Sequence, residues 1–303
     1  MQTMLRYALF ALISLFSLAP LAWGGSVTLV LSEREGVYQE YSGHLETALT
    51  GSNWTIVASH AADSLPAQAV KSDLVVTVGS EALRKTLGRS DNPPIIATLL
   101  PRQSYEKILA ESRRPGRITA IYLDQPPARQ AAFINLLLPG QKRVGMLVSG
   151  ETKSAAAPYR QALSNAGLTL DNEESDSKNL LLPALNALLG RVNVLLAIPD
   201  SRIYQRNNIK PILITAFRYQ RPVIGYSPAF VNAGALAALH STPVQIARQT
   251  AELIVANGTN LAAPVGPSHF AIAINSNVAL SLGLNLPDEA AIRRAMGADR
   301  ETP

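Results

Sequence analysis

The chain of 303 residues contains no cysteine. No disulfide can form, thiolate metal ligands are absent, and lipid anchoring through an N-terminal cysteine is excluded. Aromatic residues are also few, at 6%, and charged residues amount to only 16%. The hydrophobic share of 47% is therefore mainly aliphatic, and the length is sufficient for one large domain or two ordinary α/β lobes.

The sequence also lacks the common catalytic and nucleotide-binding motifs. The histidines His44, His60, His240 and His269 are too widely spaced to form a zinc site. Neither a Walker-type phosphate loop nor a Gly-x-Gly-x-x-Gly turn is present. The segment 225–229 has the first glycine and the serine of a hydrolase elbow, but proline follows the serine and alanine replaces the second glycine. We therefore expect no enzyme activity, no metal and no cofactor.

The net charge of +5 raises the question of a nucleic-acid partner. The basic residues are scattered along the sequence, without an aromatic stacking platform or a nucleic-acid-binding motif. A solvated basic surface explains them better, so we expect no nucleic acid among the partners.

The first 24 residues have the features of an export signal. Arg6 provides a short positive region, residues 8–23 are apolar, and small residues precede a cleavage point after Gly24. An uncleaved membrane anchor is the alternative, but the apolar stretch is short for a membrane span and contains Pro20. We expect a cleavable signal peptide at 1–24 and a soluble periplasmic protein that is not a lipoprotein.

From Ser26 onward the pattern alternates between strands and helices. A first series predicts strands at 27–31, 54–58, 73–78, 95–100 and 118–123, with helices at 38–49, 81–87 and 126–138. The residues from Pro139 to Lys142 interrupt this series, and a second series starts at Arg143. Alternating units of this kind predict an α/β fold with two doubly wound, parallel-sheet (Rossmann-like) lobes, a hinge near Pro139 and a cleft between the lobes.

The second series contains the most informative stretch, residues 192–234. An apolar run at 192–198 predicts a strand buried on both faces, a helical stripe spans 209–217, and a further strand covers 223–225. Thr242 is predicted to cap a helix that begins at Pro243, and Asn275 to cap a short helix ending near Leu282. The acidic run 171–176 is expected to be an exposed loop or a sheet edge.

Several segments resemble one known family. They are Gly79 to Ala82 (GSEA), 139–147 (PGQKRVGML), Ile198 to Ser201 (IPDS), 222–234 (PVIGYSPAFVNAG) and 275–287 (NSNVALSLGLNLP). Their order and spacing are similar to those of periplasmic substrate-binding proteins in the uncharacterised ABC-transporter family with tryptophan- and tyrosine-binding members.

The resemblance implies a type I periplasmic-binding-protein fold in which the chain crosses between lobes three times, here near Pro139, Ser241 and Pro264. The expected division is residues 25–139 plus 243–263 for lobe 1, 140–242 plus 264–287 for lobe 2, and 288–303 for a C-terminal helix and tail.

The resemblance also implies which residues line the cleft. The predicted ligand contacts are Ser32, Gly79, Ser80, Asp124, Ser149, Gly150, Asp200, Ser201, Tyr204, Tyr226 and Ser227. Gly79 and Ser80 at a helix N-terminus would suit an anionic group such as a carboxylate. Asp200 would accept from an amino group, and Tyr204 or Tyr226 would stack on a flat apolar ligand. For Asp200, Ser80 and Asp124 a capping role remains the alternative.

We therefore expect a monomeric, non-catalytic receptor that binds a small molecule in the cleft, with an amino acid as one candidate. It would deliver this molecule to an inner-membrane ABC permease. The alternative is a sensory or scaffold protein of the same fold that serves a membrane histidine kinase or an envelope complex. In either case the lobes would close on the ligand by hinge motion.

Overall fold

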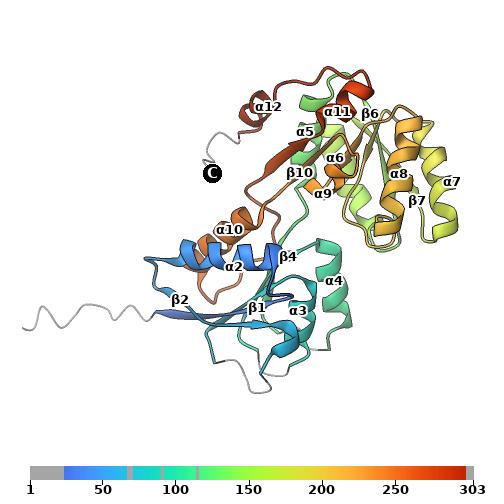
Figure 1. The fold of residues 1–303 in the computed structure, drawn as a ribbon. Helices are drawn as coiled ribbons and strands as arrows, with labels where there is room; N and C mark the ends of the chain where they lie inside the picture. The colour runs from blue at the N-terminus through green and yellow to red at the C-terminus, as the bar shows by residue number, and fades with distance from the viewer. Residues whose placement is uncertain (1–23, 67–70, 90–91, 114–115, 298–303) are drawn as a thin grey trace, which may run out of the picture.

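Two α/β lobes lie one above the other in Figure 1 and are joined by extended segments of the chain. The structure is a computed structural model that describes residues 24–66, 71–89, 92–113 and 116–297. Residues 1–23 of the predicted signal peptide lie outside the described residues. Among the described helices, none is both long and apolar enough to cross a membrane.

The first lobe is built on a five-stranded sheet with the order β2-β1-β3-β4-β5, in which all neighbours are parallel. Its strands are β1 (Gly25–Leu31), β2 (Trp54–Ala61), β3 (Leu74–Val78), β4 (Ile95–Leu100) and β5 (Ile118–Tyr122). Its helical elements are α2 (Gly36–Leu49), η2 (Ala62–Ser64), α3 (Ser80–Leu87), α4 (Arg102–Glu111) and, from later in the chain, α10 (Pro243–Asn257).

The second lobe contains a six-stranded sheet with the order β11-β10-β9-β8-β6-β7. Its strands are β6 (Arg143–Val148), β7 (Thr169–Glu174), β8 (Val194–Leu196), β9 (Val223–Gly225), β10 (Ala237–His240) and β11 (Ala271–Ile274). Its helical elements are α5 (Pro127–Leu137), η3 (Lys153–Ala155), α6 (Ala156–Asn165), α7 (Lys178–Leu189), α8 (Arg206–Arg218), α9 (Pro228–Asn232), α11 (Ser276–Ser281) and α12 (Glu289–Ala295).

The predicted α/β fold with two mostly parallel sheets is confirmed. One strand departs from it, because β11 runs antiparallel to β10. Between these strands the chain passes through α10 of the first lobe, so no helix of the second lobe crosses the sheet, and β11 returns beside β10 in the opposite direction.

Each lobe has its own apolar core on both faces of its sheet. In the first lobe, Ile246 and Ile254 of α10 are fully buried with strands β1 and β3 and helix α2. In the second lobe, α5 and α6 cover one face, and α7 and α8 cover the other. Inner strands such as β3 and β8 are continuous apolar runs because helices cover both faces of each sheet.

The predicted lobe boundary near Pro139 differs from the observed one. The predicted division places helix α5 in the first lobe, but its side chains Phe133, Ile134 and Leu137 are fully buried in the core around β6 and β8. The first crossing therefore falls between β5 and α5, around residues 124–126, because the apolar stripe of α5 is buried by the sheet that follows it.

The second crossing, between β10 and α10, lies at Ser241. In the third, Val265 still pairs with β5 of the first lobe, whereas Phe270 is buried in the core of the second. Hydrogen bonds join all three crossings. Gln125 donates through Nε2 to Ser241 Oγ at 2.7 Å, and Ser241 Oγ donates to the carbonyl of His269 at 2.6 Å.

Most predicted elements agree with the structure to within a few residues. Thr242 and Gln245 form a capping box at the start of α10, and Asn275 caps α11 by accepting from Val278 N. Helices α4 and α9 were not predicted. The acidic run lies largely in β7, which forms the edge of its sheet.

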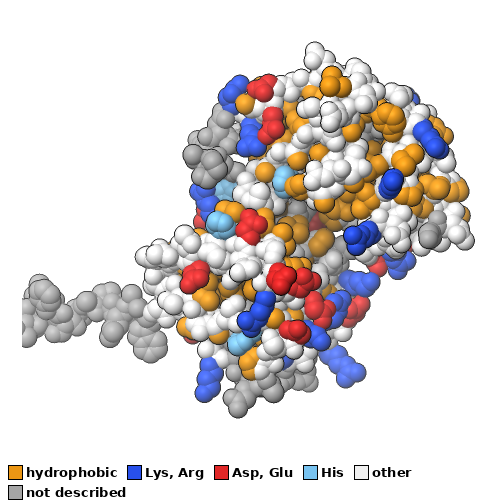
Figure 2. All heavy atoms as spheres, in the orientation of Figure 1, with side chains coloured by type: hydrophobic (Ala, Val, Ile, Leu, Met, Phe, Trp, Pro, Cys, Tyr) orange, Lys and Arg blue, Asp and Glu red, His pale blue; other side chains and the backbone are white. Residues whose placement is uncertain are grey.

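The mixture of acidic and basic side chains on the face shown in Figure 2 is typical of a solvated surface.

One glycine is required where β3 meets α3. Gly79 has φ +91° and ψ 168°, a region that only glycine occupies readily. A Cβ atom at this position would lie 2.5 Å from Ser32 Oγ and 2.7 Å from Tyr38 Cε1. The turn after β1 can therefore pack against the start of α3 only because residue 79 has no side chain.

We expect Gly79→Ala to lower the free energy of unfolding by about 3 kcal/mol through backbone strain and overpacking. Gly140→Ala is the matched control, since Gly140 has φ +92° but a Cβ atom added there would meet no atom within 4 Å. It should cost only about 1 kcal/mol. Urea denaturation measures both, and equal losses would show that the contact with Ser32 is unimportant.

Candidate ligand-binding cleft

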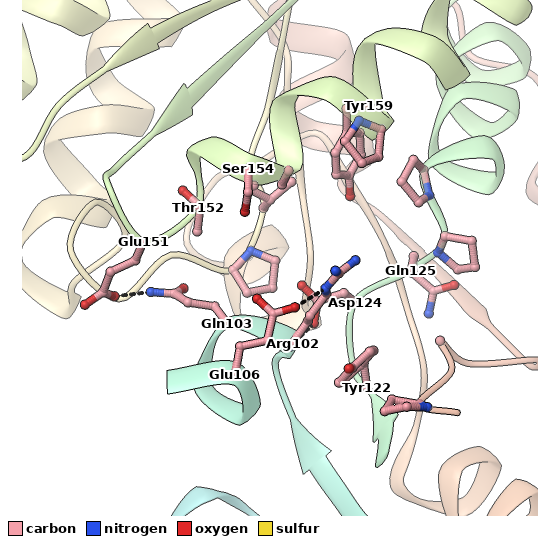
Figure 3. A pocket seen from close by; sticks show the side chains of 18 residues that line it. Arg102, Gln103, Glu106, Tyr122, Asp124, Gln125, Glu151, Thr152, Ser154 and Tyr159 are labelled. Carbon is pink, nitrogen blue, oxygen red and sulfur yellow. Dashed lines mark hydrogen bonds and ion pairs between the residues drawn. The ribbon is translucent and has the colours of Figure 1, made fainter. Parts of the chain in front are cut away.

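A cavity of about 320 Å³ lies between the lobes and is lined by residues from both. Figure 3 shows the labelled side chains that surround it. The first lobe contributes Arg102, Gln103 and Glu106 from α4 with Tyr122 and Asp124 at the end of β5. The second lobe contributes Glu151, Thr152, Ser154, Tyr159 and Pro199. The cavity is thus at the carboxyl ends of the strands, where ligands bind in open α/β sheets.

The wall formed by the first lobe contains a half-buried carboxylate. Asp124 Oδ2 accepts a hydrogen bond from the backbone N–H of Arg102 at 2.6 Å, at the start of α4. The Arg102 guanidinium turns toward Glu106 instead, with Nε 2.6 Å from Oε1. Desolvation in the cleft raises the pKa of Asp124, although the Arg102 N–H partly opposes this shift.

A backbone irregularity in β4 positions the start of α4. The pairing of β4 with β5 shifts register between Ala97 and Leu100, and Leu99 adopts a left-handed conformation with φ 51°. A leucine in this conformation is strained, and such strain is found preferentially near functional sites. The shift allows the chain to turn into α4 so that the Arg102 N–H faces Asp124.

The wall formed by the second lobe depends on Asp200, which is only 4% exposed. Its Oδ2 accepts from Ser149 N at 3.1 Å and from the hydroxyl of Thr152. Its Oδ1 accepts from the N–H groups of Arg202 and Ile203 at 2.9 and 3.0 Å. Asp200 therefore fixes the turn after β6 against the turn after β8.

Glu151 projects from the turn after β6 toward the first lobe. Its carboxylate lies 3.0 Å from Lys107 Nζ and also accepts from Gln103 Nε2, both on α4. Ser201 and Arg202 of the second lobe approach the same carboxylate. Desolvation alone would raise the pKa of Glu151, but these donors lower it to about 2.

The remaining walls are largely apolar. Prolines from the second lobe and from the crossings line the cavity, together with the rings of Tyr122 and Tyr159. Tyr122 is held edge-on by Tyr105, with ring centroids 5.5 Å apart. Burial raises the pKa of Tyr159 far above its ordinary value, so its hydroxyl stays protonated. These surfaces suit a compact ligand with an apolar body.

Of the predicted contacts, Asp124 is the one that directly lines this cavity. Ser149, Gly150, Asp200 and Ser201 lie behind its lining, where they bond to other protein groups. The N–H of Gly150, for example, donates to Asp176 Oδ1 at 2.7 Å. Their direct contact with a ligand remains a prediction.

The predicted contacts of the first lobe, Ser32, Gly79 and Ser80, cluster at the ends of β1 and β3. Ser32 Oγ accepts from the N–H of Ala82 at 3.0 Å and so satisfies the first turn of α3. These residues lie close together outside the lining of the cavity, and their contact with a ligand remains a prediction.

Tyr204 and Tyr226 form an aromatic cluster with Phe230 in the second lobe, with centroid separations of 5.2 to 6.0 Å. Tyr204 is buried, and its hydroxyl is without a hydrogen-bond partner among the described residues. Burial raises the pKa of Tyr226 to about 12. Ser227 caps α9 by accepting from Phe230 N. The predicted contacts Tyr204, Tyr226 and Ser227 also lie outside the lining of the cavity.

The sequence analysis did not identify Arg102, Gln103, Glu106 or Glu151 as site residues. Helix α4 carries buried residues at Tyr105 and Ile108, so its helical apolar spacing was present in the sequence. Glu151 follows the predicted pair Ser149 and Gly150 directly, but nothing in the local pattern indicates that its partners lie on α4.

The chain belongs to the family of ABC transporter substrate-binding proteins, whose pattern matches residues 54–295. No curated protein matches this chain in sequence. The family match, rather than any individual relative, therefore defines the class of protein.

Solved structures share the two-lobed fold. An ABC domain from Streptococcus pneumoniae in complex with L-Trp is 18% identical, covers 90% of this chain and 98% of that chain, and gives a TM-score of 0.59. A ligand-free, open substrate-binding protein with adhesive properties from Clostridium difficile is 15% identical. It covers 87% of this chain and 96% of that chain, with a TM-score of 0.65. A periplasmic ribose ABC transporter protein from Conexibacter woesei is 13% identical. It covers 86% of this chain and 95% of that chain, with a TM-score of 0.53.

The fold is therefore that of type I periplasmic binding proteins, as the resemblance implied. Substrate-binding proteins of ABC transporters bind a small molecule without chemistry and act with a membrane permease. This chain is accordingly a solute-binding protein and not an enzyme.

We expect Asp200→Ala to lower the free energy of unfolding by about 3 kcal/mol, because four donors lose a buried, charged acceptor. Asp171→Ala is the control, since the exposed Asp171 pairs with Arg191 at the surface and should cost less than about 1 kcal/mol. Thermal and urea denaturation give both values. Unchanged stability together with lost ligand affinity would instead assign Asp200 to ligand contact.

Proposed function

We propose that this protein is the periplasmic solute-binding component of an ABC uptake system and that its solute carries a cationic amino group. An amino acid is the leading candidate. The solute binds in the cavity between the lobes, and closure of the lobes around it presents the complex to an inner-membrane permease.

The observation that carries this proposal is the carboxylate of Asp124. It lines the cavity and forms no salt bridge with another described residue, because the Arg102 guanidinium pairs with Glu106 and only partly opposes the desolvation of Asp124. For this carboxylate desolvation outweighs the attraction of Arg102, and an ammonium group on the ligand would stabilise its charged form.

The opposite wall supports a ligand with a second polar end. Ser154 lines the cavity from the helical structure after β6, where its hydroxyl can donate to a carboxylate of the ligand. Prolines and the rings of Tyr122 and Tyr159 would surround the apolar body between the two ends. The similar domain from S. pneumoniae was solved with L-Trp, which has this chemical layout.

The other predicted contacts belong to the proposal as a larger set that a bulkier solute would reach. They are Ser32, Gly79, Ser80, Ser149, Gly150, Asp200, Ser201, Tyr204, Tyr226 and Ser227. We further propose export by the cleavable signal peptide at 1–24, periplasmic location and a monomeric state. A sensory or scaffold role is the alternative, and the presence of permease and ATPase genes beside this gene distinguishes transport from it.

We expect protein purified without denaturation to carry a bound amine that mass spectrometry of the extracted ligand identifies. A screen of amino acids and of the corresponding amines should then find ligands that raise the melting temperature, because a solute that binds only the folded state stabilises it. If anions or uncharged sugars raise the melting temperature and amines do not, the proposed amino-group specificity is wrong.

We expect Asp124→Asn to weaken binding of the amine about tenfold or more, because the ammonium loses a charged partner. Asp171→Asn, on the edge strand of the second lobe, is the matched control and should bind normally. Calorimetry measures both affinities.

Binding should also depend on pH. The carboxylate must be charged to hold the ammonium, so affinity is present above the pKa of Asp124 and is lost as the pH falls through it. Because burial raises this pKa, the loss should begin at a higher pH than for an exposed aspartate and should be absent in Asp124→Asn. An identical pH profile in both proteins would contradict the role of Asp124.

A further inference from the structure

The contact between Glu151 and α4 crosses the cleft. Of the ion pairs formed by residues that the structure describes, Lys107–Glu151 joins the first lobe to the second away from the three crossings, with Nζ 3.0 Å from Oε1. Gln103, one turn earlier on α4, donates to the same carboxylate and also lies 3.4 Å from Ser201 Oγ. Figure 3 shows Gln103 and Glu151 pointing toward each other and hydrogen-bonded at one edge of the cavity.

The carboxylate of Glu151 is held in position by its own lobe before α4 contacts it. Asp200 holds Ser149 and Thr152 on either side of Glu151, and Asp176 holds the N–H of Gly150. Ser201 and Arg202 then fix the carboxylate itself, at 3.0 and 3.3 Å. Little conformational entropy remains to be lost when Lys107 and Gln103 approach, which favours the contact.

The same contact also belongs to the cavity. Gln103 and Glu151 both line it, so separation of these two side chains opens the cavity on that side. The Glu151 side chain is only 15% exposed, whereas Lys107 is 51% exposed. The carboxylate is therefore shielded from water in this contact, while Lys107 reaches it from a solvated helix.

We propose that Glu151 is a positioning residue that acts as a latch: by binding Lys107 and Gln103 it populates the closed form before the solute arrives. The effect on solute affinity rests on the proposed function, whereas the latch itself does not. Apparent affinity scales with the fraction of binding-competent molecules, so weakening the latch raises the apparent dissociation constant.

The expected effect of the latch on the ratio of open to closed molecules, and its dependence on salt, follow from the exposure of the Lys107–Glu151 pair. A partly exposed ion pair changes an equilibrium by about two- to fivefold, and salt weakens it. The carboxylate stays charged down to strongly acidic pH, because its donors lower the pKa of Glu151 to about 2 despite desolvation. The latch therefore responds to ionic strength, and changes of pH around neutrality leave it unaltered.

Two variants separate the latch from a purely local role of Glu151. Lys107→Gln removes the partner in the first lobe, and Arg202→Gln removes a partner in the same lobe as Glu151. The two cations have nearly equal exposure, at 51% and 50%. Only Lys107→Gln deletes an attraction between the lobes, so only this variant should favour the open form.

The absence of cysteine allows closure to be measured directly. Glu111→Cys in α4 and Arg206→Cys in α8, both exposed, would carry a donor and an acceptor fluorophore on the two sides of the cleft. Energy transfer is recorded on ligand-free protein in low and high salt. X-ray scattering of the unlabelled chain gives an independent radius of gyration.

We expect Lys107→Gln and Glu151→Gln to shift the ligand-free open-to-closed ratio about two- to fivefold at low salt and to abolish its salt dependence. Their effects should be non-additive in the double variant, as for residues in direct contact. Arg202→Gln should open the cleft much less than Lys107→Gln and should keep the response to salt, because Ser201 still holds the carboxylate and the pair with Lys107 remains.

The latch is refuted if Lys107→Gln leaves energy transfer and its salt dependence as in the parent, or if Arg202→Gln opens the cleft equally. Because these measurements use ligand-free protein, they remain decisive when no solute is found. Conversely, normal solute binding with unaltered closure in Lys107→Gln would reject the latch and leave the proposed function standing.

Discussion

The organisation of the cleft depends on one buried carboxylate. Asp200 follows β8 and receives hydrogen bonds from its own turn and from the turn after β6, so that two neighbouring strand ends become a single rigid unit. The residues that line the second lobe's side of the cavity, including Thr152 and Glu151, project from this unit. Without it, the wall would be a pair of independent loops.

The lobes must also move relative to each other, and the three crossing segments allow this motion. Each lobe completes its own core, and the lobes are connected by three extended segments. The hydrogen bonds from Gln125 to Ser241 and on to the carbonyl of His269 tie these segments together. Hydrogen bonds of this kind keep the segments together as a unit, which fits a hinge that bends while the lobes remain rigid.

The sequence analysis succeeded for features that neighbouring residues determine. The buried strands, the capping box at Thr242 and the cap at Asn275 all follow from local composition and spacing. It failed where distant contacts decide. Helix α5 has an apolar stripe that either lobe could bury. The start of α4 depends on a strained backbone conformation at Leu99, which the residue pattern does not indicate.

By itself, the sequence determined the class of fold, the positions of most elements and the membership of a binding-protein family, because hydrophobic periodicity and short motifs are local properties. Tertiary structure alone decided which polar groups remain free to meet a ligand. Asp200 and Asp124 both follow strands, yet the first is saturated by protein donors and the second faces the cavity. The difference arises because residues distant in the chain compete for the same acceptor, and only the folded arrangement fixes which of them reach it.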